Sequence, residues 1–194
     1  GVKGGRWHSL IDKVYSKANL RAAFARVSAN GGSAGVDHET VEHFAKRIEE
    51  EIEKISQSLQ ENTYQPNPVR RTWIPKAGRK ELRPLGIPTV RDRTVQAALY
   101  NAIAPIFEAG FSEHSYGFRP GRGCKDALRR VTELLRNGYV HVVDADIKAF
   151  FDTIPHARML ERVSAKISDG RILGLIEKYL SQGVVEGASR WTPE

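Results

Sequence analysis

Three carboxylates and two adjacent aromatic residues lie within the eleven positions from Val142 to Asp152. Carboxylate oxygens are the protein ligands that Mg²⁺ prefers, usually together with substrate phosphate. A cation bound there would activate an attacking oxygen and neutralise charge in phosphoryl transfer. The spacing leaves a second interpretation open, in which Asp146 caps a turn and Asp152 caps the following helix without any metal.

Two cations, Lys76 and Arg83, lie on either side of a short polar turn in a proline-rich segment. If the segment folds back as a β-hairpin, the two side chains stand on opposite arms and are able to converge on a triphosphate. The alternative is that both are ordinary solvated surface charges.

Aromatic residues and arginines alternate in a glycine-rich stretch between Ser115 and Gly123. Such a loop suits close approach to a nucleic-acid backbone, with rings available for stacking and guanidinium groups for phosphate. In the competing interpretation, Tyr116 and Phe118 are buried and pin the loop. The basic residues that we assign to nucleic-acid contact, here and in the hairpin, are Arg70, Arg71, Arg119 and Arg122.

The elements that must position these residues are helices, one hairpin and one late strand. Hydrophobic spacing predicts two short helices over 10–29 and one helix from an Asp37 N-cap to residue 59. Prolines exclude a helix over 64–90, where 69–74 and 82–85 form the hairpin. Further helices are predicted from residue 92, bent or ended by Pro105, and over 125–136, 155–166 and 169–180. Four residues are expected to be buried in the 125–136 helix: Leu128, Val131, Leu134 and Leu135.

Residues 139–146 alternate in the manner of a buried strand, with Asp144 and Asp146 on the same face as two valines. Packing alone would not select carboxylates at such positions. The order of helices, a hairpin and a late strand predicts an α+β fold rather than an alternating parallel sheet.

The 194 residues carry a net charge of +7, and this charge is concentrated in two segments. Residues 69–93 hold eight basic and two acidic residues, and residues 113–136 hold six and three, whereas 37–61 is acidic. Clustered cations of this kind indicate a polyanionic partner, because neutralising phosphates releases counterions. A basic but merely solvated face is the alternative.

Composition excludes several classes of protein. No apolar run approaches the roughly 20 residues that a membrane span needs. The single Cys124 excludes an intramolecular disulfide framework and favours the cytosol. The chain does not begin with Met, and its ends suggest a piece excised from a longer protein.

Taken in order, these segments resemble the N-terminal part of the reverse transcriptases encoded by group II introns, also called maturases. The resemblance covers about residues 18–194. It is carried by these segments: Asn30-Gly31-Gly32, Gly35-Val36-Asp37, Tyr64-Gln65-Pro66, Ile74-Pro75-Lys76, Arg83-Pro84-Leu85-Gly86-Ile87-Pro88, Asp92-Arg93, Gln96, Tyr116-Gly117-Phe118-Arg119-Pro120-Gly121-Arg122 and Asp146-Ile147-Lys148-Ala149-Phe150-Phe151-Asp152.

The resemblance implies a role for each matching residue. Asp146 matches the first catalytic, metal-binding aspartate, with the backbone carbonyl of Ile147 as a second ligand. Lys76 and Arg83 match residues that grip the triphosphate of the incoming nucleotide. Phe151 matches the bulky residue beneath the sugar that favours deoxynucleotides, and the loop of Arg119 matches a segment along the template.

It also implies a fragment of a right-hand polymerase, with an N-terminal helical extension over 1–35, fingers over 36–138 and part of the palm over 139–194. The family's two-metal Mg²⁺ site needs two further carboxylates from a Tyr-x-Asp-Asp hairpin, which this sequence lacks. Asp146 alone cannot hold two metals about 3.5–4 Å apart. We therefore expect this piece to be inactive by itself and the full-length protein to be an RNA-directed DNA polymerase.

The implied partners are an RNA template, intron RNA, a DNA primer and deoxynucleoside triphosphates, with no membrane. The implied location is the prokaryotic cytosol in a nucleoprotein, with an organelle as the alternative, and a homodimer is left open. Two other functions compete with this interpretation. One is an RNA-binding maturase module without polymerase activity, and the other is a prokaryotic reverse transcriptase of another lineage.

Overall fold

The computed structural model describes residues 2–75, 78, 81–187 and 189–191, so Lys76 lies outside the described residues. The chain forms two compact units. The first combines Gly1–Ile103 with His156–Glu194, and the second is Ala104–Pro155. Helices, a two-stranded sheet and a four-stranded sheet make up the regular elements of the described residues, which confirms the predicted α+β class. No helix in the described ranges is both long and apolar enough to cross a membrane.

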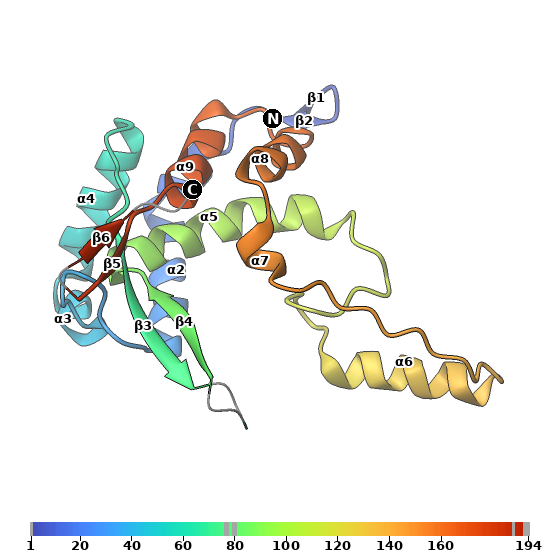
Figure 1. The fold of residues 1–194 in the computed structure, drawn as a ribbon. Helices are drawn as coiled ribbons and strands as arrows, with labels where there is room; N and C mark the ends of the chain where they lie inside the picture. Colours follow the sequence, from blue (N-terminus) through green and yellow to red (C-terminus); the bar gives the residue numbers. More distant parts are fainter. Residues whose placement is uncertain (1, 76–77, 79–80, 188, 192–194) are drawn as a thin grey trace. The chain divides into compact units, whose positions relative to one another are not determined.

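Four N-terminal helices of the first unit pack against one another (Figure 1). Apolar residues three and four positions apart meet on one side of each helix, and these faces pack together. The fully buried members include Val14, Leu20, Phe44, Ile52 and Ile55. The helices are α1 (Ile11–Tyr15), α2 (Lys17–Asn30), α3 (Val41–Lys46) and α4 (Ile48–Gln60).

Two details of this bundle differ from the sequence-based expectation. The helix predicted up to residue 59 is divided at Arg47, whose φ of −121° leaves the helical region. The N-cap of α3 is Thr40, whose hydroxyl accepts the backbone N–H of His43 at 3.2 Å. Asp37 instead accepts the N–H of Glu39 at 3.1 Å and so forms a turn ahead of the helix.

The predicted hairpin is confirmed as β3 (Val69–Pro75) and β4 (Leu82–Ile87), paired antiparallel from Arg70 opposite Ile87 to Pro75 opposite Leu82. Two strands that the sequence did not reveal extend the sheet, β5 (Val184–Glu186) and β6 (Ser189–Trp191). The sheet order is β4-β3-β5-β6, with β5 parallel to β3. The hairpin is therefore tied to the C-terminal part of the chain.

Asp169 joins the beginning of the chain to its last helix. One carboxylate oxygen, Oδ2, accepts the backbone N–H groups of Leu10 at 2.7 Å and Ile11 at 3.0 Å. The other, Oδ1, accepts those of Arg171 and Ile172 and caps the helix that follows. Trp7 adds a second link through backbone hydrogen bonds to Lys166 and Ser168. The elements on the two sides of these links are the hairpin β1 (Val2–Lys3) and β2 (Arg6–Trp7) and the helices α8 (His156–Ser164) and α9 (Gly170–Leu180).

A fully buried carboxylate, Asp92, lies in the first turn of α5 (Val90–Glu108). Its Oδ2 accepts the Thr89 hydroxyl at 2.7 Å and the Asn67 backbone N–H at 3.0 Å. Its Oδ1 accepts the hydroxyl of Tyr64. The Tyr64 hydroxyl also lies 2.8 Å from that of Tyr179 on α9. One carboxylate therefore connects α5, the segment before β3 and α9.

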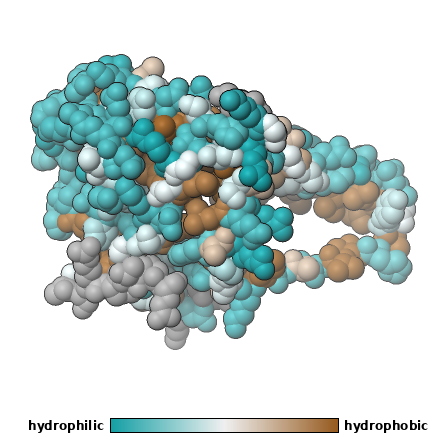
Figure 2. Space-filling view, turned by 90° about the horizontal axis from the view of Figure 1, so that it is seen from above, coloured by the Kyte–Doolittle hydropathy of each residue, from teal (hydrophilic) through white to brown (hydrophobic). Residues whose placement is uncertain are grey.

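The second unit holds α6 (Cys124–Arg136) and α7 (Phe150–Thr153), and here two predictions are wrong. Residues 139–147 form no strand and are exposed, because a strand needs a neighbour for its backbone hydrogen bonds and no described strand pairs with them. None of the apolar side chains expected inside α6 is buried. The surface is mainly hydrophilic with hydrophobic patches (Figure 2). The exposed apolar residues of this unit include Leu128, Val131, Leu135, Val142 and Val143.

Tyr64, which is buried, and Tyr179, which is half-buried, predict how stability depends on pH. Burial raises the pKa of Tyr64 and of Tyr179. The folded state then keeps both protonated while the unfolded state ionises, so stability is full below about pH 10 and falls as the pH rises further. Tyr179→Phe removes one ionisable group and one hydrogen bond. We expect it to cost about 1 kcal/mol at about pH 8 and to make the loss of stability above about pH 10 shallower.

Denaturant unfolding on both sides of that pH measures this effect. Tyr100→Phe is the matched control, because it removes the hydroxyl of an exposed tyrosine on α5 and leaves the Tyr64–Tyr179 hydrogen bond in place. An unchanged alkaline slope in Tyr179→Phe would contradict the proposed contribution of the Tyr64–Tyr179 pair.

Candidate functional site

The register of the hairpin divides its arginines between two faces. Residues directly opposite each other share a face, so Arg70 and Arg83 lie on one face, the latter opposite Ile74. Arg71 lies on the other face, together with Trp73. Arg83 is exposed, as the predicted role at a triphosphate requires. The predicted convergence of Lys76 and Arg83 falls partly outside the described residues.

Arg70 fixes a neighbouring loop by hydrogen bonds to its backbone. Its Nε and Nη2 atoms donate to the carbonyl oxygen of Ala34 at 3.1 and 2.7 Å. From α5, Arg93 donates to the carbonyl oxygens of Gly31 at 3.0 Å and Ser33 at 3.1 Å. Two guanidinium groups thus hold residues 31–35 on the Arg70 face of the hairpin.

Gly35 allows this loop to approach α5 closely. A Cβ atom at this position would lie 2.7 Å from the Cα and backbone N of Thr89. No side chain fits there unless one backbone moves, so the glycine in the Gly35-Val36-Asp37 segment has a steric explanation.

Burial lowers the pKa of Arg93, while the negative charge of Asp37 acts in the opposite direction. Its Nε is buried and has no hydrogen-bond partner among the described residues. The guanidinium group still stays charged at neutral pH, since its ordinary pKa lies far above neutrality. Arg93 therefore acts as a cationic anchor for the loop.

Arg119 is almost entirely enclosed by its own loop. Its side chain is 7% exposed, and Nε and Nη2 donate to Glu108 Oε1 at 2.9 and 2.7 Å. Nη1 donates to the carbonyl oxygens of Ser112 at 2.6 Å and Ser115 at 2.8 Å. The planar guanidinium thus fastens the loop to the end of α5. Its predicted contact with nucleic acid is not tested by this geometry.

The sequence left open whether Tyr116 and Phe118 are buried and pin this loop or are exposed for stacking, and the two rings differ in this respect. Tyr116 is half-buried, with the Arg122 guanidinium 5.9 Å from its ring centre. Phe118 is 97% exposed and has a left-handed φ of 55°. Tyr116 helps to pin the loop, whereas Phe118 presents a ring to the solvent and is available for stacking.

The segment with the candidate catalytic carboxylate is exposed along its length. Asp146 ends an irregular stretch, and Ile147 is 67% exposed. Ala149 then adopts a left-handed conformation, with φ of 52°, and α7 begins at Phe150. The rings of Phe150 and Phe151 meet edge to face, with centroids 5.5 Å apart. A single turn thus separates the carboxylate from the aromatic pair.

The donors at this segment have the right chemistry for a hard divalent cation but are few. Within the described ranges, no group of three or more His, Cys, Asp or Glu side chains is placed to hold a metal. Asp146 contributes one carboxylate. Mg²⁺ is often bound by one or two carboxylates together with water and substrate phosphate, so one carboxylate is compatible with it.

A family model described as reverse transcriptase (RNA-dependent DNA polymerase) matches residues 74–194, more than half of the chain and including the Asp146 segment. The chain belongs to the reverse transcriptase family. The family's chemistry is nucleotidyl transfer, which typically uses divalent metals.

Curated relatives confirm the predicted group II intron type. The group II intron-encoded protein LtrA of Lactococcus lactis subsp. cremoris is 39% identical over 166 residues, which are 84% of this chain and 27% of that protein. Protein YkfC of Escherichia coli (strain K12) is 38% identical over 181 residues, 90% of this chain and 47% of that protein. The chain thus spans about a quarter to a half of the length of these relatives.

A solved structure has a fold similar to that of this chain. A chain of the partial Cas6-RT-Cas1–Cas2 complex matches 100% of this reverse transcriptase chain and 33% of its own length, with a TM-score of 0.58. The sequence identity is 19%, so this likeness shows the fold alone.

Several residues that organise the reverse transcriptase chain were not assigned a role from the sequence. Tyr64, Asp92 and Arg93 lie within the segments that carry the resemblance, yet their bonds depend on distant partners. One local signal was present, since Thr89 precedes Asp92 by three residues as in a capping box. Nothing local marks Tyr179 as the partner of Tyr64, or Leu10 and Ile11 as partners of Asp169.

The close approach at Gly35 predicts the effect of adding one methyl group. Gly35→Ala forces a clash with the Thr89 backbone, and we expect it to reduce the free energy of unfolding by about 1–3 kcal/mol. Urea unfolding measures the change. Gly174→Ala is the control, because its Cβ meets nothing within 4 Å on α9 and should stabilise the helix by up to about 1 kcal/mol. Equal stability of the Gly35→Ala protein and wild type would refute the steric explanation.

Proposed function

We propose that the full-length protein is an RNA-directed DNA polymerase of the group II intron type. The observation that carries this proposal is the family match over residues 74–194, which includes the Asp146 segment. The intron-encoded relative LtrA supports the group II assignment, and the exposed Arg83 of the hairpin supports binding of a polyanion.

The proposed reaction extends a DNA primer on an RNA template. The primer 3′-hydroxyl attacks the α-phosphate of a deoxynucleoside triphosphate, forming a new P–O bond and losing its proton. The bond between the α- and β-phosphates breaks, and pyrophosphate leaves with its electron pair. Such transfers depend mainly on positioning and on electrostatic stabilisation of the phosphoryl oxygens.

In this proposal, residues 36–138 serve as fingers and residues 139–194 as part of the palm. Arg83 and Lys76 bind the triphosphate, and Phe151 excludes a 2′-hydroxyl beneath the sugar. The exposed position of Arg83 supports its role, and the exposure of Phe151 leaves its ring free to meet a nucleotide. Arg71 and Arg122 remain candidates for nucleic-acid contact, with Arg70 and Arg119 also fixing backbone.

The proposed cofactor is Mg²⁺, with the Asp146 carboxylate and the Ile147 carbonyl oxygen as the ligands from this chain. When bound, the cation lowers the pKa of the attacking hydroxyl and neutralises phosphate charge. The left-handed residue Ala149 lies between these ligands and Phe151, and it marks the start of α7.

A role in binding intron RNA during splicing is the second candidate function. It is favoured by the charge of +7 and by the relative that is itself named as intron-encoded. Polymerase and maturase functions are compatible in one protein, because phosphate-binding surfaces outside the catalytic centre serve either role. The proposed location is the cytosol of a prokaryote.

A matched pair of aspartates tests the proposed polymerase function. We expect Asp146→Asn in the full-length protein to reduce primer extension on an RNA template by about a hundredfold or more, because a ligand of the cation is lost. Asp144→Asn changes a neighbouring exposed aspartate in the same irregular segment and should lower the rate by only a few-fold at most. Extension that survives Asp146→Asn at the rate of the control would exclude Asp146 as the catalytic residue.

A further inference from the structure

Helix α6 carries three cations on one side. Lys125, Arg129 and Arg136 lie within about 40° of one another around the helix axis, since each residue turns the helix by about 100°. At a rise of about 1.5 Å per residue they extend along about 16 Å of the axis. All three side chains are exposed.

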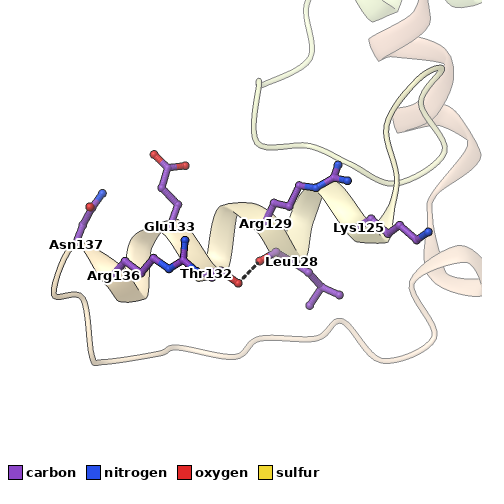
Figure 3. A pocket seen from close by; sticks show the side chains of 7 residues that line it. All are labelled: Lys125, Leu128, Arg129, Thr132, Glu133, Arg136 and Asn137. Atoms are coloured by element: carbon purple, nitrogen blue, oxygen red, sulfur yellow. Dashed lines mark hydrogen bonds between the residues drawn. The ribbon is translucent and has the colours of Figure 1, made fainter.

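These cations border an open hollow of about 630 Å³ on the surface of α6, shown in Figure 3. The other residues that line it are Leu128, Thr132, Glu133 and Asn137. Figure 3 shows the side chains projecting from the helix along its length. The hollow belongs to the second unit alone, and the exposed apolar residues Val131 and Leu135 lie outside its lining.

The charge of the hollow is positive and available to a ligand. Glu133 is the one acidic residue of its lining, and it is already paired with Arg130 at 2.8 Å. Arg129 pairs with Asp126, but its side chain is 75% exposed, and such surface pairs exchange readily for another anion. Within the part of the chain that the structure describes, Lys125 and Arg136 have no acidic partner.

The side chains that line the hollow indicate which kind of nucleic acid it suits. Proteins that bind single-stranded nucleic acid stack bases on aromatic rings. None of the seven lining residues is aromatic. Double-helical RNA is instead bound through its phosphates and 2′-hydroxyls, which Lys and Arg charges and the polar groups of Thr132 and Asn137 match.

We propose that this side of α6 binds the sugar–phosphate backbone of double-helical RNA, independently of base sequence. Each strand of B-form DNA carries a phosphate about every 3.4 Å of helix axis, and A-form RNA is more compact, so a stripe of about 16 Å reaches several phosphates. The proposal rests on the proposed RNA-binding function and adds its location and the form of RNA that it takes. It is distinct from the Arg70, Arg71, Arg119 and Arg122 assignments.

The test measures the salt dependence of RNA affinity with the full-length protein. The probe is an RNA duplex of about 16 base pairs and arbitrary sequence, alongside one of its single strands. The variant K125Q/R129Q/R136Q removes the three cations and keeps helix-forming side chains at these positions. We expect duplex affinity at low salt to fall by about tenfold or more, and the slope of log K against log salt to decrease by about three.

The control variant is K3Q/K13Q/K46Q, which removes three exposed lysines of the first unit and the same net charge. It should leave most of the duplex affinity and slope in place. Circular dichroism of both variants checks that helix content is kept. An equal change in both variants would show that only the total charge matters and would overturn the proposal. An equal loss for duplex and single strand would also overturn it.

The test separates this inference from the proposed polymerase function. Absence of primer extension by the wild-type protein would refute the proposed polymerase function. A difference in duplex affinity between the two variants would still support the α6 surface. A duplex affinity that is unaffected by K125Q/R129Q/R136Q would refute the α6 surface whether or not the wild-type protein extends primers.

Discussion

The buried carboxylate of Asp92 is the constraint on which the first unit depends. A carboxylate removed from water is costly unless its oxygens are hydrogen-bonded, and three donors surround this one. These donors come from Tyr64, Asn67 and Thr89, which lie before β3 and at the start of α5. Tyr179 extends the network to α9, so segments more than a hundred residues apart are fixed together. Loss of the Tyr64 hydroxyl would leave the buried Oδ1 without its hydrogen-bond donor.

The basic hairpin and its loop take their positions from this point. Arg93 follows Asp92 in α5 and reaches back to the carbonyl oxygens of Gly31 and Ser33, while Arg70 reaches the same loop from β3. The cations that carry most of the local charge therefore have two functions. Some fix backbone, whereas others such as Arg83 stay exposed for a ligand. This division explains why charge alone does not identify the residues that meet a polyanion.

Sequence patterns predicted the elements that are stabilised locally. Apolar spacing located α2, α4, α6 and α9, and prolines with β-branched residues located the hairpin, because these signals act within a few positions. The predictions of a strand over 139–146 and of a buried face on α6 were wrong, because both features depend on a distant partner surface. The Asp92 and Asp169 bonds could not be predicted for the same reason. For the candidate site, the motif located Asp146 and Phe151, but no local pattern shows what lies opposite them.

Native-state hydrogen exchange of the Asp92→Asn protein tests most directly whether Asp92 unites the first unit. Asn replaces one accepting oxygen of Asp92 with an NH₂ group, which only donates. At least one of the groups that donate to Asp92, on Tyr64, Asn67 or Thr89, then loses its acceptor. The account predicts that amides in β3, the first turn of α5 and α9 lose protection together, while Asp12→Asn, at an exposed position, leaves them protected. A loss confined to the first turn of α5 would contradict it.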